Sequence, residues 1–589
     1  MMRSRETRHE RRSGGYDRRL PTLRYGFVAL AGIIVLRLFT LQVVDAAYYT
    51  AAATDQFSFY SELAPERGKI LARDLKDGQL YPVATNINLG LVFADPRNFK
   101  DVHAESETIG AILGMTDEDR ALLADKLAEN KQKQWLVIQK NVPEELLAQI
   151  DLAKKEGKLA GISYHRVPSR TYPETGFSGH VLGFVGSNED GSLTGKYGLE
   201  GYFDEMLTGV RGFLDSEQDA AGRFIVGGDR LFQPAVDGAD IVLTIDRNIE
   251  YTVCKMLSQA VLRHGADGGS VIILNPSTGA VLAMCGSPGF DPNRYNEVDD
   301  INTFNNPATF NAYEPGSIFK PITMAAALDT GAVTPATTFV DTGSVTIDDR
   351  TIGNADDKVY GEQNMTQVLE ESINTGMIFT QQQMGKEAFK TYVQNFGFGA
   401  YTGIELSKEV PGNVSSLEKK GDVFAATASF GQGITVTPIQ MAQAFAALAN
   451  GGTLMQPYIV EEKRMADGTV EKTTPIQIRR VITDKTANLI SAMLISVVEN
   501  GHGKRAGVPG YYIAGKTGTA QVAGSAGSYL EGVTIGSFAG YGPVGDPKFA
   551  MVVRIDHPRD VQYAESTAAP LFGEIADFLL RYFEVPPQR

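Results

Sequence analysis

The stretch from Pro509 to Gln521 reads PGYYIAGKTGTAQ, and its local fold decides what its lysine can do. Residues 510–517 satisfy the letters of the nucleotide-binding pattern G-x-x-x-x-G-K-[ST]. A phosphate-binding loop needs small residues before the lysine and a helix after it. Here Tyr-Tyr-Ile-Ala stands at the variable positions and Gly-Thr-Ala-Gln-Val follows Lys516-Thr517, so both flanks are typical of a strand. The sequence therefore predicts a lysine on a sheet edge and disfavours an ATPase.

An earlier segment offers a serine and a second lysine. Residues 314–320 read EPGSIFK, and a Pro-Gly break is followed by an apolar run through Leu328. This pattern places Ser317 at the start of a helix with Lys320 on the same face, at i, i+3 spacing. A serine hydroxyl becomes a good nucleophile when a base accepts its proton. Lysine can be that base if burial and a nearby cation, such as a protonated Lys516, lower its pKa.

The third element is Ser372-Ile373-Asn374, whose serine can relay a proton and whose amide can hold a substrate peptide bond. Ser372 lies 55 residues after Ser317, and Lys516 lies 142 residues after Asn374. Each triplet alone arises often by chance. In this order they form the Ser-x-x-Lys, Ser-x-Asn and Lys-Thr-Gly set of penicillin-recognising enzymes. A Ser-His-Asp hydrolase is disfavoured because the chain has no G-x-S-x-G elbow and only 7 histidines.

The chain's length and charge distribution indicate a membrane-anchored protein of several domains. Its 589 residues exceed what one hydrophobic core usually supports. Residues 1–24 carry eight Arg against three acidic residues, a balance of +5, which leaves −20 on residues 25–589. Residues 25–44 then read YGFVALAGIIVLRLFTLQVV, with Arg37 as the one charge, and about 30 Å of helix spans a hydrocarbon core. A basic leader before such a helix predicts a cytoplasmic N-terminus rather than nucleic-acid binding. A cleaved signal peptide is the alternative.

Only two cysteines occur, Cys254 in a helical-looking run and Cys285 at the end of a strand-like run. They cannot form a disulfide framework, and one bridge is possible in an oxidising compartment. We expect two free, partly buried thiols.

The segment pattern predicts an α/β organisation of the α+β type. Two helices are expected over residues 116–130 and 142–156, and a second domain is expected to begin near Ile241. There a strand runs into a helix capped by Asp246, and residues 271–284 form a hairpin. Further elements are a helix at 437–450, strands at 511–514, 535–539 and 549–555, and a closing helix near 570–583. Consecutive strands without helices between them predict an antiparallel sheet.

The whole chain resembles the class B high-molecular-weight penicillin-binding proteins, the monofunctional peptidoglycan D,D-transpeptidases. Besides YEPGSIFKP at 313–321 and KTGTAQ at 516–521, family-like segments are RGKILARD at 67–74, HVLGFVG at 180–186, GLEG at 198–201 and SFGQGITVT at 429–437. The resemblance implies a five-stranded antiparallel sheet flanked by helices. The implied domains are a basic tail at 1–24, a transmembrane helix at 25–44, an elongated non-catalytic pedestal (dimerisation-like) domain at 45–235 and a transpeptidase domain at 236–589.

By that resemblance, Ser317 attacks the carbonyl of the penultimate D-Ala of a stem peptide, and Lys320 is the general base. Ser372 passes a proton to the leaving amine, and Asn374 binds the donor side chain. The substrate's terminal carboxylate is held by Lys516, Thr517 and Thr519 on the strand that includes Gly518, and the N–H groups of Ser317 and Thr519 form the oxyanion hole. We expect no metal or cofactor.

The implied partners are D-Ala-D-Ala stem peptides, β-lactams, a membrane-embedded glycan polymerase and division proteins, with the catalytic domain outside the plasma (inner) membrane. RLFTLQV at 37–43 is similar to the membrane exit segment of the septal subgroup. The resemblance leaves two roles open for Arg37, contact with a membrane-embedded glycan polymerase or snorkelling to the lipid headgroups. An elongation-type enzyme, an idle cell-wall scaffold and a penicillin sensor remain alternatives. A hydrolytic D,D-carboxypeptidase or β-lactamase is another.

Overall fold

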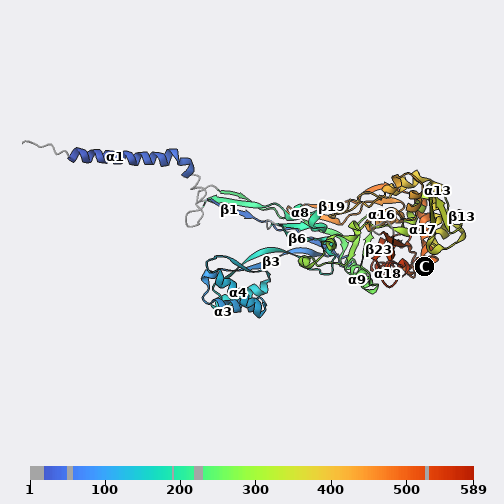
Figure 1. Ribbon diagram of the computed structural model, residues 1–589, viewed down its shortest axis with the longest axis horizontal. Coiled ribbons are helices and arrows are strands. Elements are labelled where there is room, and N and C mark those ends of the chain that lie inside the picture. Colours follow the sequence, from blue (N-terminus) through green and yellow to red (C-terminus); the bar gives the residue numbers. More distant parts are fainter. Residues whose placement is uncertain (1–18, 50–57, 189–191, 218–229, 524–528) are drawn as a thin grey trace, which may run out of the picture. The chain divides into compact units, whose positions relative to one another are not determined.

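The computed structural model describes residues 19–49, 58–188, 192–217, 230–523 and 529–589 (Figure 1). The chain divides into two compact units. The first comprises Met1–Pro65 with Val210–Val236, and the second comprises Glu66–Gly209 with Asp237–Arg589.

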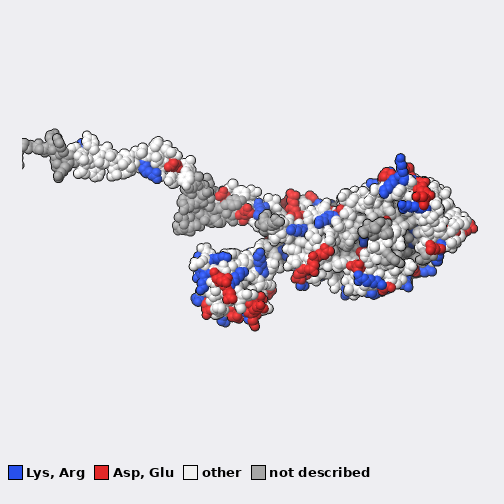
Figure 2. Space-filling model, viewed as in Figure 1, with Lys and Arg blue, Asp and Glu red and all other residues white. Residues whose placement is uncertain are grey.

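The first unit contains the N-terminal helix and a small sheet. Helix α1 (Arg19–Phe39) continues as a π-helical turn (Thr40–Val44), and Pro21–Val44 is the one described segment long and apolar enough to cross a membrane. Figure 2 shows α1 as almost entirely white, without charged side chains over most of its length. The sheet has the order β1 (Ser58–Leu63), β8 (Gly212–Glu217), β9 (Arg230–Gln233), with antiparallel neighbours.

The second unit opens with a seven-stranded sheet. Its order is β19-β18-β10-β2-β3-β4, with β5 also paired to β3, and β10 runs parallel to β2. The helices expected at 116–130 and 142–156 are confirmed as α4 and α5, which pack with α3 on β3 around Leu127, Leu147 and Ile150. The bounds are β2 Ile70–Arg73, β3 Leu80–Ala94, α3 Val102–Ile112, α4 Asp117–Glu129, β4 Leu136–Val142, α5 Glu144–Lys155, β5 Ile162–Thr171, β10 Asp240–Asp246, β18 Val460–Arg464 and β19 Val470–Lys472.

The five-stranded antiparallel sheet expected from the resemblance is present, with the order β12-β11-β23-β22-β21. Its strands are β11 (Gly268–Leu274), β12 (Val281–Ser287), β21 (Ala514–Ala523), β22 (Tyr529–Gly542) and β23 (Phe549–Asp556). The start predicted for the strand at 511–514 is wrong, because β21 begins at Ala514. Tyr511 lies in a bend, and Tyr512 and Ile513 precede the strand, which extends through the lysine segment instead.

Alternation along the strands divides this sheet into two buried faces. Val271 and Val553 lie in a core with helices α9 and α18, whereas Ile272 and Val552 lie in a second core with α11 and α16. The predicted cap is confirmed, because Asp246 accepts a hydrogen bond from Ile249 N, and Thr437 caps α16 in the same way by accepting one from Gln440 N. These helices are α9 Arg247–Arg263, α11 Lys320–Asp329, α16 Pro438–Ala449, α17 Asp484–Glu499 and α18 Ala568–Tyr582.

Shorter elements complete the second unit. Before the sheet lie α6 Gly179–Leu182, β6 Phe184–Ser187, β7 Leu193–Lys196, α7 Gly198–Tyr202 and α8 Asp204–Thr208. After β12 lie α10 Pro307–Phe310, β13 Thr338–Asp341, β14 Ser344–Ile347, β15 Arg350–Gly353, β16 Gly361–Asn364, α12 Met365–Glu370, α13 Asn374–Met384, α14 Lys386–Asn395, α15 Val423–Ala428, β17 Thr453–Met455 and β20 Gln477–Arg480.

The expectation of free thiols is wrong. Cys254 on α9 and Cys285 on β12 form a disulfide, with Cα atoms 5.2 Å apart. The two residues lie 31 positions apart in unlike contexts, and only the packing of α9 across β12 makes them neighbours. The bridge therefore joins a helix to the edge strand of the central sheet.

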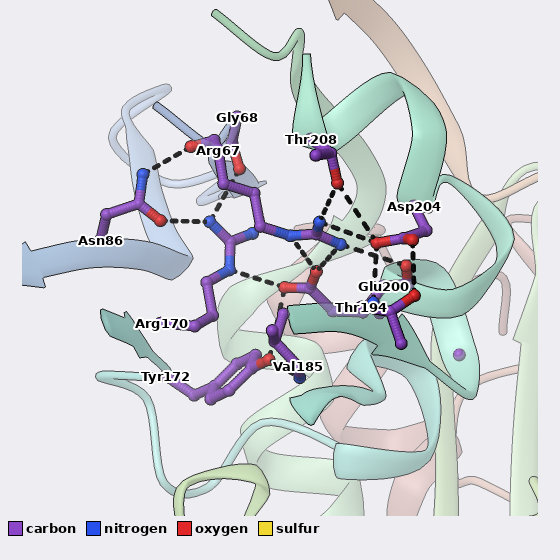
Figure 3. Close-up of polar contacts among 12 residues, drawn as sticks. Arg67, Gly68, Asn86, Arg170, Tyr172, Val185, Thr194, Glu200, Asp204 and Thr208 are labelled. Carbon is purple, nitrogen blue, oxygen red and sulfur yellow. Dashed lines mark hydrogen bonds and ion pairs between the residues drawn. The ribbon is translucent and has the colours of Figure 1, made fainter. Parts of the chain in front are cut away.

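A buried ionic cluster joins segments of the second unit that precede the five-stranded sheet (Figure 3). The Glu200 carboxylate is fully buried and pairs with two guanidinium groups, Arg67 at 2.6 Å and Arg170 at 2.7 Å. Arg67 also donates a hydrogen bond to Oδ1 of Asp204. Oδ2 of the same carboxylate accepts a hydrogen bond from the Thr194 hydroxyl. Two of the segments singled out in the sequence, at 67–74 and at 198–201, thus meet at one carboxylate, together with Arg170 of β5.

We expect Glu200→Gln to lower the midpoint of thermal unfolding by several degrees. Removing one partner of a buried ion pair leaves uncompensated charge and costs about 3 kcal/mol or more. The control Glu144→Gln removes the partner of Arg166 at an exposed site and should change the midpoint by about a degree or less. Differential scanning calorimetry measures both, and equal midpoints for the two variants would contradict the structural role of Glu200.

Candidate active site

The predicted nucleophile occupies a tight turn against the edge strand β21. Ser317 is half-buried in a 3-10 turn, η5 (Gly316–Phe319), immediately before α11. Gly316 has φ 56° and donates its N–H to Gly431 O at 3.1 Å. A Cβ on Gly431 would lie 2.2 Å from Gly316 O, so only glycine allows these backbones to meet. The family-like segment at 429–437 therefore supports the nucleophile turn.

Lys320 points into the centre of the site and is completely buried. Its Nζ donates to Ser372 O at 2.5 Å, Ser372 Oγ at 3.2 Å and Asn374 Oδ1 at 2.8 Å. Burial lowers the pKa of Lys320 well below its ordinary value, and repulsion by Lys516 lowers it further. A lysine with a depressed pKa, one turn from a serine, can accept that serine's proton.

The Ser-x-Asn segment lies against Lys320 in a constrained backbone conformation. Ser372 has φ 57°, which is rare for a residue other than glycine and is maintained where the surroundings require it. Asn374 begins α13, and its Nδ2 donates to Gly353 O at 3.1 Å. Both side chains are half-buried.

Lys516 is the second fully buried lysine. Its Nζ donates to the carbonyl and the hydroxyl of Thr517, at 3.2 and 3.3 Å. Burial lowers the pKa of Lys516 to about 7, and the Glu565 carboxylate opposes this shift. Lys516 is the charge that depresses the pKa of Lys320. The site thus holds two buried amines, of which one favours its neutral form.

The remaining predicted residues lie along β21, where Thr517 is buried. A Cβ on Gly518 would lie 2.9 Å from Ile318 Cγ2 and 3.0 Å from Ile318 N, so glycine lets the nucleophile turn contact this strand. Thr519 is exposed, and its Oγ1 accepts a bond from Ala564 N at 3.1 Å. All eight residues singled out in the sequence are therefore brought together, where three chain segments meet.

The structure adds contacts that sequence patterns did not indicate. Glu314 accepts hydrogen bonds from Gly433 N at 2.8 Å and from the Tyr529 hydroxyl at 2.9 Å. One carboxylate thus ties the nucleophile segment to a supporting loop and to the start of β22. Glu314 stands within the family-like segment at 313–321, but Tyr529 is more than 200 residues away and no local pattern connects them.

Comparison with known proteins identifies the class that this fold and site define. Residues 269–577 match the model of the penicillin-binding protein transpeptidase domain, and residues 62–243 match that of the penicillin-binding protein dimerisation domain. The chain belongs to the penicillin-binding protein family, as a class B peptidoglycan D,D-transpeptidase.

Similarity to relatives extends over nearly the full length. Stage V sporulation protein D of Bacillus subtilis is 36% identical over 96% of this chain and 86% of its own. The peptidoglycan D,D-transpeptidase FtsI homolog of Mesostigma viride is 30% identical, over 95% of each chain. The crystal structure of penicillin-binding protein 3 from Mycobacterium tuberculosis with aztreonam matches with a TM-score of 0.68 and 26% identity, covering 90% of this chain and 98% of that one.

We expect Gly518→Ala to slow acylation by a fluorescent penicillin about 10- to 100-fold, because the added methyl group pushes the nucleophile turn from β21. Stopped-flow fluorescence measures the rate. Gly289→Ala is the matched control, since its Cβ would meet nothing closer than 3.7 Å. An unchanged rate in Gly518→Ala would mean that the turn and the strand do not need this close contact.

Proposed function

We propose that Ser317 is the nucleophile of peptidoglycan cross-linking and that Lys320 is its general base. The observation that carries this proposal is the complete burial of Lys320 one turn after the serine, with its Nζ bound to oxygen acceptors alone. An amine in this position is depleted of its charge by desolvation and by Lys516. In its neutral form it can accept the serine proton.

In the acylation step, Ser317 Oγ forms an ester with the carbonyl carbon of the penultimate D-Ala. The peptide bond to the terminal D-Ala breaks, and its nitrogen leaves as an amine. The serine proton passes to Lys320, and Ser372, which lies 3.2 Å from Lys320 Nζ, relays a proton to the leaving amine. An amine of a neighbouring stem peptide then attacks the ester, which forms the cross-link and frees Ser317.

The edge of β21 is proposed to bind the donor. Lys516, with Thr517 and Thr519, holds the terminal carboxylate, while Asn374 binds the donor side chain. Backbone N–H groups of Ser317 and Thr519 stabilise the oxyanion, and loss of one such donor typically costs about 100- to 1,000-fold in rate. β-Lactams present a carboxylate and a reactive carbonyl to the same groups, and the aztreonam complex of the Mycobacterium tuberculosis relative supports their binding here.

Purified protein exposed to benzylpenicillin should gain the mass of one adduct, and Ser317→Ala should gain none. Intact-mass spectrometry measures the adduct, and circular dichroism shows whether the variant is folded. Incubation with a glycan polymerase and lipid-linked precursor should then give cross-linked dimers. Free tripeptide or tetrapeptide stems without dimers would indicate hydrolysis instead. A folded parent without an adduct would refute Ser317 as the nucleophile and favour a scaffold.

We propose that α1 anchors the chain in the plasma membrane, with the basic tail in the cytoplasm and the catalytic sheet outside. The eight Arg residues of positions 1–24 support this orientation, because positive flanks remain cytoplasmic. The Cys254–Cys285 disulfide supports an oxidising compartment for the catalytic domain. We also propose that the pedestal domain spans residues 45–235 and that the transpeptidase domain spans residues 236–589.

The proposed role is septal wall synthesis together with a membrane-embedded glycan polymerase and division proteins. The FtsI names of relatives such as that of Mesostigma viride support it. A second candidate is sporulation, supported by the 36% identical protein of Bacillus subtilis. A labelled chain found at the septum of growing cells supports the first role, and one found only in sporulating cells supports the second.

We expect Arg37→Leu to reduce co-purification of the glycan polymerase several-fold and to weaken septal localisation. A charged side chain in an apolar helix is costly in the membrane, and a polar contact with a partner protein lowers that cost. The matched variant Arg24→Leu removes a charge near the other end of α1. Both variants should stay in the membrane after carbonate washing. Unchanged association in Arg37→Leu would mean that the arginine only reaches the headgroups.

A further inference from the structure

A buried carboxylate holds together the segments around the Ser-x-Asn motif. Asp341, the last residue of β13, is 2% exposed. Its Oδ1 accepts hydrogen bonds from Thr375 Oγ1 at 2.6 Å and Gly343 N at 3.0 Å. Its Oδ2 accepts them from Tyr360 N at 2.8 Å and Asn354 Nδ2 at 2.9 Å. A carboxylate removed from water is costly unless such donors satisfy it, so the segments that carry the four donors are held in one arrangement.

Asn354 extends this network to the first turn of α13. It directly follows β15, and its backbone N–H donates to Gly343 O at 3.0 Å. Its Oδ1 accepts a hydrogen bond from Thr375 N at 3.1 Å. The first N–H groups of a helix have no partner within that helix, and the apolar N-cap residue, Ile373, has no side-chain acceptor to offer. Asn354 therefore caps α13 from another part of the chain.

The same network holds the amide of Asn374 from two sides. Asn374 directly precedes Thr375, and its Nδ2 donates to Gly353 O at 3.1 Å, next to Asn354. Its Oδ1 accepts the hydrogen bond from Lys320 Nζ at 2.8 Å. The nitrogen of an amide donates and its oxygen accepts, so the carbonyl of Gly353 directs the oxygen towards Lys320. The reverse orientation would place two donors against each other at Lys320.

We propose that Asp341, Asn354 and Thr375 are positioning residues for the reaction, which hold Asn374 with its amide oxygen on Lys320 and its amide nitrogen on Gly353. The inference rests on the proposed function, in which Lys320 is the base and Asn374 binds the donor. Asn354 and Thr375 are 7% and 6% exposed, and Asp341 is more buried still. These three residues therefore act on the substrate through Asn374 and not by contact.

The first test is Thr375→Val, which removes the hydroxyl bonds to Asp341 and Asn354 but keeps the backbone N–H that Asn354 caps. Stopped-flow fluorescence with a fluorescent penicillin at several concentrations separates initial binding from acylation. We expect acylation to slow about 10-fold, because the Asn374 amide is no longer held in its productive orientation. Thr375→Ser restores the hydroxyl and should return most of the rate.

Thr380→Val is the matched control, because it removes another buried hydroxyl from the same helix. Thr380 Oγ1 donates to Gly376 O at 2.7 Å and makes no contact with the Asp341 network. Both valine variants should lower the midpoint of thermal unfolding by similar amounts. Acylation of Thr380→Val should stay within about 2-fold of the parent's rate. Equal losses of rate in the two variants would mean that Thr375 only stabilises the helix, and would overturn the inference.

A double-mutant cycle shows whether Thr375 acts through Asn374. In an Asn374→Ala background there is no amide to orient, so Thr375→Val should change the acylation rate by less than about 2-fold. Losses that multiply independently would overturn the inference. An Asn374→Ala variant that is acylated as fast as the parent would also overturn it.

Asp341→Asn tests the centre of the network. An amide nitrogen cannot accept the bonds that one carboxylate oxygen accepts, so acylation should slow at least as much as in Thr375→Val. Circular dichroism shows whether this variant is folded, and a folded variant with the parent's rate would refute the role of Asp341. If the variant does not fold, the Thr375 and Thr380 variants decide the question.

Failure of the inference and failure of the proposed function give different results. A parent that is acylated on Ser317, while Thr375→Val is acylated at the parent's rate, refutes the positioning network alone. A folded parent that forms no adduct refutes the proposed nucleophile, and the inference falls with it.

Discussion

The burial of two lysines in one site is the constraint on which the rest of this structure depends. An ammonium group removed from water is costly, and a second one nearby adds repulsion. Lys320 meets this cost by losing its charge readily and by binding three oxygen acceptors. Backbone segments must come close enough to supply these acceptors. Close packing then explains the positive φ of Ser372 and the glycines at 316, 431 and 518.

The sequence predicts the parts of the site that depend on local patterns. Ser317 and Lys320 share a helical turn, and the strand around Lys516 follows from its β-like neighbours. The fold, in contrast, is predicted only from the order of the three motifs, because no local signal indicates that three distant segments meet. The disulfide was mispredicted because helix and strand contexts do not reveal which packed elements face each other. The contacts of Glu314 were missed because its partners lie far away along the chain.

The ionic cluster around Glu200 has a different character from the catalytic one. Its carboxylate is matched by two guanidinium groups, with further bonds from Thr194 and Thr208 to Asp204. A buried ion pair of this kind contributes little net stability over an apolar core, but it is satisfied by only one geometry. It therefore defines how β2 and β5 meet the short helix α7. From there β10 pairs with β2 in parallel and leads into α9, which the disulfide joins to the central sheet.

The register between β21 and β22 determines which residues surround Lys516. Lys516 pairs with Ala539, which lies in the core with α11 and α16, whereas Phe538 lies in the core with α9 and α18. A slip of β21 by one residue against β22 would turn the side chains of β21 to the opposite face. Lys516 would then point at α18. Phe538 packs at a tilt against Phe572, with ring centroids 4.5 Å apart, which favours this register from the opposite face. The aromatic core behind the sheet is thus a condition for the chemistry in front of it.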